Sequence, residues 1–222
     1  MSPAETVDRL AADEMRAALG GALIGRDIIV LDQTGSTNDA ILEIATPGSR
    51  EGLVLFAEHQ TAGRGQRGNR WESAGARGLW FSILLRPSIE IKRSPLLTAW
   101  AAESISGAIE NECSLKTTIK LPNDVQIDGR KVAGVLVEMR AQERAPHLAV
   151  IGIGINVNQA LEDFPKDLHS RVVSLAMALG RQVDRQNFAT VVLRNLDRSY
   201  RERFGGSSNP LLDVRSGGEA AI

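Results

Sequence analysis

Residues 60–71 read QTAGRGQRGNRW and combine three glycines with three arginines, without an acidic residue. The glycines permit positive φ angles and a close approach of the backbone to a ligand. Arg64, Arg67 and Arg70 each carry a permanently charged planar fork that suits carboxylate and phosphate groups. In a chain of formal net charge -1, this local concentration of positive charge predicts an anion-binding loop.

The same loop contains GRGQRG at 63–68, which matches the dinucleotide-binding pattern G-x-G-x-x-G. That pattern requires a helix to begin within the motif, so that its N-terminus meets the pyrophosphate. Here it continues into NRWESAGARG, which is polar and glycine-containing, so we reject the dinucleotide interpretation. A solvated surface loop remains an alternative, although Trp71 offers an aromatic face on which a base can stack.

A second concentration of reactive side chains is IKLPNDVQIDGRKVAG at 119–134. It places Lys120, Asp124 and Lys131 around a Pro-Asn turn and a hairpin, whose tight connections keep the three side chains close. From spacing alone, an ordinary polar hairpin is equally compatible with this segment.

Other polar positions have a purely structural interpretation. STN at 36–38 is typical of a helix N-cap, and the glycines of GIGIN at 152–156 permit close packing within a strand. The chain has no P-loop sequence, and its three histidines lack metal-ligand spacing, so no metal ligands are assigned. Its single cysteine, Cys113, excludes an internal disulfide and fits a reducing, cytoplasmic location as a buried thiol.

Hydrophobic periodicity predicts the elements that position these motifs. An α+β domain is expected, with a mixed β-sheet flanked by helices. Strands are expected at 28–31, 53–57, 79–85, shortly before a turn at 128–129, at 132–139 and at 147–157. Helices are expected at 4–19, 39–45, 95–112, 170–179 and 185–203.

The overall composition is that of an ordinary globular domain. Of 222 residues, 43% are hydrophobic and 24% are charged, and 26 basic residues nearly balance 27 acidic ones. No bulk attraction to nucleic acid or to a membrane is therefore expected. No apolar run reaches the roughly 18 residues of a membrane span, and no signal peptide is evident.

Four motifs in order resemble the biotin protein ligases over roughly residues 28–200. They are STND (36–39), EHQTAGRGQRGNRW (58–71), KLPNDVQIDGRKVAGVLVE (120–138) and GIGINVN (152–158). The resemblance implies a class II aminoacyl-tRNA synthetase-like, biotin–lipoate ligase catalytic core over residues 1–204. It also implies an AMP-forming biotin–[biotin carboxyl carrier protein] ligase. Such an enzyme joins biotin and ATP to biotinyl-5′-AMP, releases pyrophosphate, and passes biotin to a lysine of a carboxylase carrier domain. Mg²⁺ is expected with ATP, its ligands being unknown.

The resemblance assigns roles to individual residues. The expected catalytic residues are Arg64 and Lys131, which face the biotin carboxylate and the phosphates, and Asp124, which orients or deprotonates the incoming amine. The expected biotin-binding set is Ser36, Thr37, Asn38, Gln60, Arg64, Gly65, Gln66, Lys131 and Gly134. The expected nucleotide-binding set is Arg67, Trp71, Lys120, Asn123 and Asn156. Trp71 would stack on adenine, a side chain at Gly134 would obstruct the ligand, and loop 63–71 would close over the intermediate and exclude water.

Three features depart from the family pattern. Gln66 replaces a common arginine, which is expected to loosen retention of the adenylate, and Leu121 replaces the usual tryptophan of the Pro-Asn turn. The family's small C-terminal SH3-like barrel is not evident, because 205–222 reads as a linker-like tail. Fewer than about 30 residues precede the first strand, which is too few for a winged helix-turn-helix, so no DNA binding is expected.

Two other functions remain open at this stage. One is a lipoate or octanoyl ligase, against which GRGQRG and KLPND argue. The other is a ligase-like protein that holds biotin or biotinyl-AMP with weak transfer, which Gln66 and the absent barrel keep possible. The carrier served and the oligomeric state, including a homodimer, are not specified by the sequence.

Overall fold

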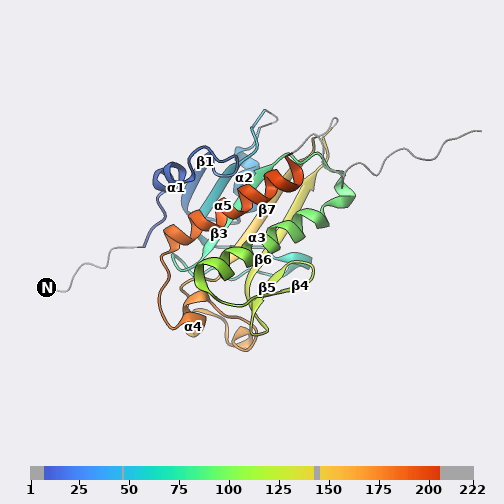
Figure 1. Cartoon of the computed structure of the whole chain (residues 1–222). Coiled ribbons are helices and arrows are strands. Elements are labelled where there is room, and N and C mark those ends of the chain that lie inside the picture. The colour runs from blue at the N-terminus through green and yellow to red at the C-terminus, as the bar shows by residue number, and fades with distance from the viewer. Residues whose placement is uncertain (1–7, 47, 143–145, 206–222) are drawn as a thin grey trace, which may run out of the picture.

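The computed structural model describes residues 8–46, 48–142 and 146–205. Its seven strands form one mixed sheet in the order β1-β2-β3-β7-β6-β5-β4. β1 and β2 pair in parallel, and all other neighbours pair antiparallel (Figure 1). The strands are β1 Asp27–Thr34, β2 Leu53–Gln60, β3 Leu79–Leu85, β4 Thr118–Lys120, β5 Asp124–Ile127, β6 Arg130–Arg140 and β7 Leu148–Ile155.

Helices cover both faces of the sheet unequally. The long helices α3 and α5 pack side by side along one face, whereas the short α2 lies on the other (Figure 1). The α-helices are α1 Ala12–Leu19, α2 Thr37–Ile44, α3 Pro95–Cys113, α4 Leu175–Leu179 and α5 Arg185–Phe204. Short 3-10 helices occupy Gln66–Gly68, Ile91–Arg93, Leu161–Asp163 and Lys166–Leu168. The predicted mixed sheet flanked by helices is therefore confirmed.

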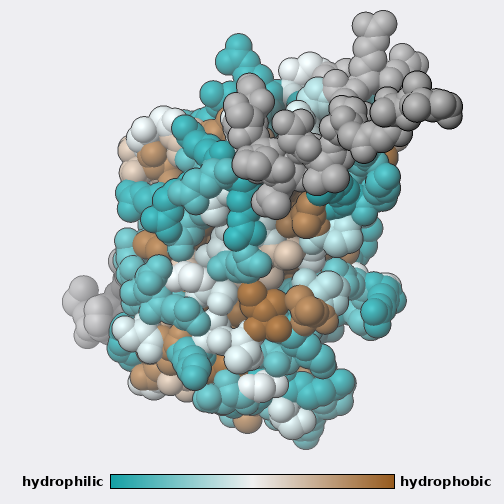
Figure 2. All heavy atoms as spheres, turned by 45° about the vertical axis from the view of Figure 1, so that its right-hand side comes forward, coloured by the Kyte–Doolittle hydropathy of each residue, from teal (hydrophilic) through white to brown (hydrophobic). Residues whose placement is uncertain are grey.

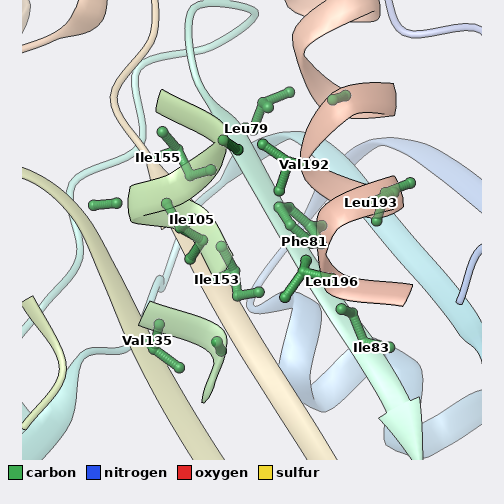
Figure 3. Close-up of a cluster of buried hydrophobic side chains, with 14 of the residues drawn as sticks. Leu79, Phe81, Ile83, Ile105, Val135, Ile153, Ile155, Val192, Leu193 and Leu196 are labelled. Carbon is green, nitrogen blue, oxygen red and sulfur yellow. The ribbon is translucent and has the colours of Figure 1, made fainter. Parts of the chain in front are cut away.

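The main core lies between the sheet and the layer of α3 and α5 (Figure 3). Leu79, Phe81 and Ile83 reach it from β3, because alternate residues of a strand point to the same face. Fully burying a side chain of this size contributes about 1.5–3 kcal/mol. Leu84, one residue on, instead packs under α2 in a smaller cluster on the opposite face. Cys113 is buried at the end of α3, as predicted.

The outer surface is mostly hydrophilic. Figure 2 shows small separate apolar patches among hydrophilic side chains on the face that it presents. Among the described residues, no helix combines the length and the hydropathy that a bilayer crossing needs.

The predicted N-terminal helix 4–19 is wrong at its start. Residues 1–7 lie outside the described part of the chain, and the helix begins only at Ala12. Tertiary hydrogen bonds replace helical ones before it: Leu10 N donates to Glu58 Oε1 at 2.8 Å, and Ala11 N donates to Gln186 Oε1 at 3.0 Å. These hydrogen bonds attach residues 10 and 11 to side chains of β2 and α5.

The predicted helix 170–179 is also too long. Only Leu175–Leu179 is helical, and Ser174 caps it by accepting from Met177 N. The preceding residues pair with the start of β6, where Lys131 N donates to Arg171 O at 2.8 Å and Val173 N donates to Lys131 O at 3.0 Å. The predicted tail lies, after Gly205, outside the described residues.

The predicted turn at 128–129 is confirmed. Asp128 and Gly129 both have positive φ, 49° and 73°, as a two-residue hairpin turn requires. This turn joins β5 to β6 and so brings Asp124 beside Lys131.

Candidate active site

One cavity collects all nine residues that were expected to bind biotin. It lies between the start of α2, the loop that follows β2, and the middle of β6 and β7. The space that its lining encloses, open mouth included, is about 430 Å³. Besides those nine residues its lining comprises Trp71, Asn123, Val135, Leu136, Gly152, Ile153 and Gly154.

The start of α2 forms a buried polar wall. Ser36, Thr37 and Asn38 are all buried, yet Ser36 makes no side-chain capping hydrogen bond. Instead the Gln60 side chain caps the helix, since Thr37 N donates to Gln60 Oε1 at 2.8 Å. Ser36 therefore occupies the predicted N-cap position without using its hydroxyl as the cap, and it lines the cavity.

The Asn38 amide is bonded at both ends. Ser82 Oγ donates to Asn38 Oδ1 at 2.6 Å and lies 2.8 Å from Thr37 Oγ1, while Asn38 Nδ2 donates to Glu138 Oε2 at 2.6 Å. Gly152 makes room for this amide, because a Cβ there would lie 2.3 Å from Asn38 Oδ1. Asn38 thus lines the cavity, and each polar atom of its amide has a hydrogen-bond partner within the protein.

The glycine-arginine loop folds back on itself. Arg64 and Arg70 form an antiparallel bridge, and Gly65 N donates to Asn69 O at 2.7 Å. Arg67 has φ 57° within the 3-10 turn of the loop; it is exposed and does not line the cavity that holds Arg64. A single 3-10 turn interrupts the loop and no helix begins in it, so the rejection of the dinucleotide interpretation is confirmed.

Arg64 reaches from this loop to two carboxylates. Its Nη2 lies 2.7 Å from Asp39 Oδ1 and 3.0 Å from Glu138 Oε2, and its Nη1 donates to Glu138 Oε1 at 3.2 Å. The arginine is therefore paired with carboxylates of the chain itself.

Trp71 lies on a floor of glycine. Gly134 and Gly154 pair directly across β6 and β7. A Cβ on Gly154 would lie 2.4 Å from the Trp71 ring, and one on Gly134 would lie 2.8 Å from it and 2.9 Å from Lys131 Cε. Lys131 Nζ stands 4.9 Å from the Trp71 ring centroid, within cation–π range, and Trp80 packs edge-on at 6.0 Å. The glycines thus accommodate the indole itself.

Lys131 lies where three cavities meet. Its Nζ is 2.7 Å from Asp124 Oδ1, an ion pair whose angles fall outside hydrogen-bond geometry. Asp124 lines not the first cavity but a neighbouring polar one, which also contains Lys120, Arg70 and Arg171. Lys131 thus lines both the first cavity and this polar cavity, whereas Asp124 lines only the polar one.

A third cavity, a mainly apolar slot, shares Trp71 and Lys131 with the first cavity. Phe164, Leu168 and Val172 supply most of its apolar lining, and Asn156, Arg70 and Glu72 also line it. Asn156 Nδ2 donates to Val173 O at 3.2 Å and to Lys131 O at 3.4 Å. Both hydrogen bonds of its amide nitrogen therefore go to main-chain carbonyl groups.

Asn123, which was expected to bind the nucleotide, lines the first cavity rather than the slot. Its Nδ2 donates to Val135 O at 3.1 Å. Of the five expected nucleotide-binding residues, only Trp71 and Asn156 therefore meet at the slot.

Sequence reasoning gave no role to three residues that bond the cavity lining at Asn38 and Arg64: Asp39, Ser82 and Glu138. Each carried a weak signal, since Ser82 and Glu138 are polar positions inside apolar strands and Asp39 follows the STN motif. Which face of the sheet Ser82 and Glu138 occupy depends on strand register, which the sequence pattern alone did not supply. Asp39 lies in α2.

No group of three or more His, Cys, Asp or Glu suited to a metal ion occurs among the described residues.

Comparison with known proteins agrees with this geometry. The sequence matches the model of the biotin/lipoate A/B protein ligase family over residues 30–156. It is 36% identical over 203 residues to the bifunctional ligase/repressor BirA of Bacillus spizizenii, covering 91% of this chain and 62% of that protein. It is also 36% identical over 205 residues to the biotin--[acetyl-CoA-carboxylase] ligase of Mycobacterium tuberculosis, covering 86% of this chain and 72% of that protein.

Solved structures show the same core. The biotin protein ligase of Aquifex aeolicus in complex with biotin and ATP aligns with a TM-score of 0.70 at 31% identity, over 82% of this chain and 73% of that one. The predicted biotin–lipoate ligase fold is therefore confirmed. The chain spans less than two thirds of the Bacillus relative.

Proposed function

The chain belongs to the biotin/lipoate A/B protein ligase family, and from this premise we propose that it is a biotin protein ligase. It would join biotin to ATP, forming biotinyl-5′-AMP and pyrophosphate, and then pass biotin to a lysine of a carrier domain. The observation that carries the proposal is the single cavity that gathers the nine expected biotin-binding residues beside Lys131.

The cavity suits the heterocyclic end of biotin. The buried Ser36 and Thr37 and the half-buried Gln60 supply polar atoms to the cavity. A ureido group needs such donors and acceptors once it leaves water. The Asn38 amide is held by Glu138 and Ser82, and it retains one N–H and one oxygen lone pair for a ligand.

Activation would take place where Lys131 meets the cavity. A biotin carboxylate oxygen attacks the α-phosphorus of ATP, a new P–O bond forms, and the bond to the β-phosphate breaks to release pyrophosphate. Both reactants are anions, so a cation held at the point of attack lowers the barrier. Lys131 stands at the junction of the three cavities and is the cation best placed for this step.

The apolar slot suits adenine. Trp71 offers an aromatic face, and Phe164, Leu168 and Val172 add apolar lining to the same slot. Such a pairing binds a base chiefly by stacking and exclusion of water. Mg²⁺ usually binds through substrate phosphates and one or two carboxylates, and we expect it to accompany ATP here; Asp124 is the carboxylate nearest to Lys131.

Transfer would use the polar cavity that holds Asp124. A lysine amine entering there meets a carboxylate that can orient it or accept its proton, and then attacks the acyl carbon of the adenylate, from which AMP departs. The partner would be a biotin carboxyl carrier protein or carrier domain. A cytoplasmic location, which the unpaired Cys113 supports, completes the proposal.

One assay tests this function against its alternatives. Purified protein is incubated with ATP, labelled pyrophosphate, biotin or lipoate, and an apo carrier domain. Biotin-dependent exchange of label into ATP together with biotinylation of the carrier is expected. Exchange without biotinylation favours the alternative that Gln66 keeps open, an adenylate-binding protein with weak transfer. Exchange with lipoate only, or with neither acid, would overturn the proposal.

A further inference from the structure

Glu138 connects two parts of the cavity that belong to different elements. Its carboxylate accepts two hydrogen bonds from Arg64, at 3.2 and 3.0 Å, and a third from Asn38 Nδ2 at 2.6 Å. Arg64 lies on the glycine-arginine loop, and Asn38 lies in the first turn of α2. One side chain of β6 therefore holds both the loop and the helix.

The orientation of Asn38 follows from its partners. An ionised carboxylate can only accept hydrogen bonds, so the amide nitrogen of Asn38 must face Glu138 and its oxygen must face the buried Ser82 hydroxyl. Gly152 leaves the space that this amide fills. A continuous series of contacts thus runs from the interior at Ser82, through Asn38 and Glu138, to the loop at Arg64.

A second carboxylate completes the arrangement. Asp39 Oδ1 lies 2.7 Å from Arg64 Nη2, and we call Asp39 and Glu138 together the carboxylate clamp. A single ion pair at this half-exposed arginine is worth little. A two-point contact with Glu138 plus a second carboxylate adds geometric definition as well as energy. Because the clamp brings two negative charges to one positive charge, Arg64 presents no net positive charge to an approaching anion.

We propose that Glu138 is a positioning residue for the adenylation site. Through Arg64 it holds the glycine-arginine loop beside the cavity, and through Asn38 it fixes the wall formed by α2, so that loop and wall are set together. The kinetic consequence of this inference rests on the proposed function, whereas its structural consequence does not.

Limited proteolysis tests the structural consequence. Glu138→Gln keeps an oxygen for Asn38 Nδ2 but loses the charge that holds Arg64. Trypsin cleavage after the exposed Arg67 is expected to become about threefold to tenfold faster in the native protein, at an unchanged melting temperature. The matched control is Glu103→Gln, which removes a carboxylate from an exposed ion pair with Arg203 and leaves cleavage at the wild-type rate.

A double-mutant cycle separates the clamp from general loosening. In an Arg64→Ala background, Glu138→Gln should accelerate cleavage after Arg67 no further, because the partner is gone. Glu138→Asp, which keeps the charge, should restore part of the protection. The proposal fails if Glu138→Gln cleaves at the wild-type rate, if the acceleration persists without Arg64, or if all tryptic sites open together as the melting temperature falls.

Pyrophosphate exchange tests the kinetic consequence. Glu138→Gln should raise the KM for biotin by a similar factor while kcat stays within about twofold, as expected when binding geometry rather than chemistry is impaired. An unchanged KM would overturn this part. If wild-type protein shows no biotin-dependent exchange, the proposed function fails, and the proteolysis comparison still decides the clamp.

Discussion

At the scale of single residues, the cations of the cavity are paired with carboxylates of the chain itself. Arg64 is paired with Asp39 and Glu138, and Lys131 with Asp124. Lys131 also lies over the Trp71 ring, so its position is defined from two sides. The two cations therefore have different expected roles: Lys131 meets the reacting groups, whereas Arg64 anchors the loop.

Replacing Lys131 with alanine should abolish adenylate formation. The variant loses the cation at the junction of the cavities and leaves Asp124 without its partner. Biotin-dependent pyrophosphate exchange should fall by about a hundredfold or more. Lys92→Ala, which removes an exposed ion pair with Glu90, serves as the control. Arg64→Ala should mainly weaken ligand retention, and wild-type exchange in both site variants would mean that the site is misplaced.

Replacing Gly134 with alanine should disturb the site without a ligand being involved. The new methyl group would lie 2.8 Å from Trp71 and 2.9 Å from Lys131 Cε, so both side chains must move. A displacement of about 1 Å at a reacting group can cost a hundredfold in rate, and we expect at least a tenfold loss of exchange. An unaffected rate would show that Trp71 and Lys131 tolerate the shift.

At the scale of elements, the apolar runs predicted the central strands well because a buried strand needs little besides its hydrophobic residues. The errors lie where another part of the chain supplies the hydrogen bonds. The side chains of Glu58 and Gln186 accept hydrogen bonds from the main chain before α1. The main chain of Lys131 forms hydrogen bonds with the segment before α4. The resemblance to a family located the cavity residues, but Ser82 and Glu138 became visible only once strand register placed them beside Asn38.

Helix α3 offers a direct test at this scale. Gly107 lies in its interior, and a Cβ there would meet nothing closer than Asn195 Nδ2 at 3.9 Å. Glycine costs about 1 kcal/mol relative to alanine inside a helix. Gly107→Ala should therefore raise the free energy of unfolding in urea by about 0.5–1 kcal/mol, with exchange activity retained. A lower free energy of unfolding would show that this position is more crowded than the structure indicates.

At the scale of the whole molecule, buried polar groups tie the termini of the described chain to the sheet. Arg185 at the start of α5 is fully buried and bonds Glu58 and Asp8. At the other end of the same helix, the buried Tyr200 hydroxyl donates to Glu51 Oε2 at 3.1 Å. Burial raises the pKa of Tyr200 above the ordinary phenol range, and the charge of Glu51 and the hydrogen bond to it add to this shift.

This shift predicts a loss of stability at high pH. A group whose pKa is raised by folding stabilises the folded state fully below its unfolded pKa, about 10 for tyrosine, and the contribution falls as pH rises above that value. The free energy of unfolding should therefore fall by about 1 kcal/mol near pH 10.5 from this group, and Tyr200→Phe should lack that part of the fall. Because the chain has one tyrosine, absorbance titration at 295 nm reads this group alone, and a midpoint near pH 10 in folded protein would contradict the prediction.

The glycine floor under Trp71 also has an optical consequence. Of the three tryptophans, Trp80 and Trp100 are fully buried, whereas Trp71 lines both the cavity and the slot beside it. An occupant of either space changes the surroundings of one indole and leaves the other two in the interior. The emission spectrum of the unlabelled chain can therefore follow ligand binding at this one position.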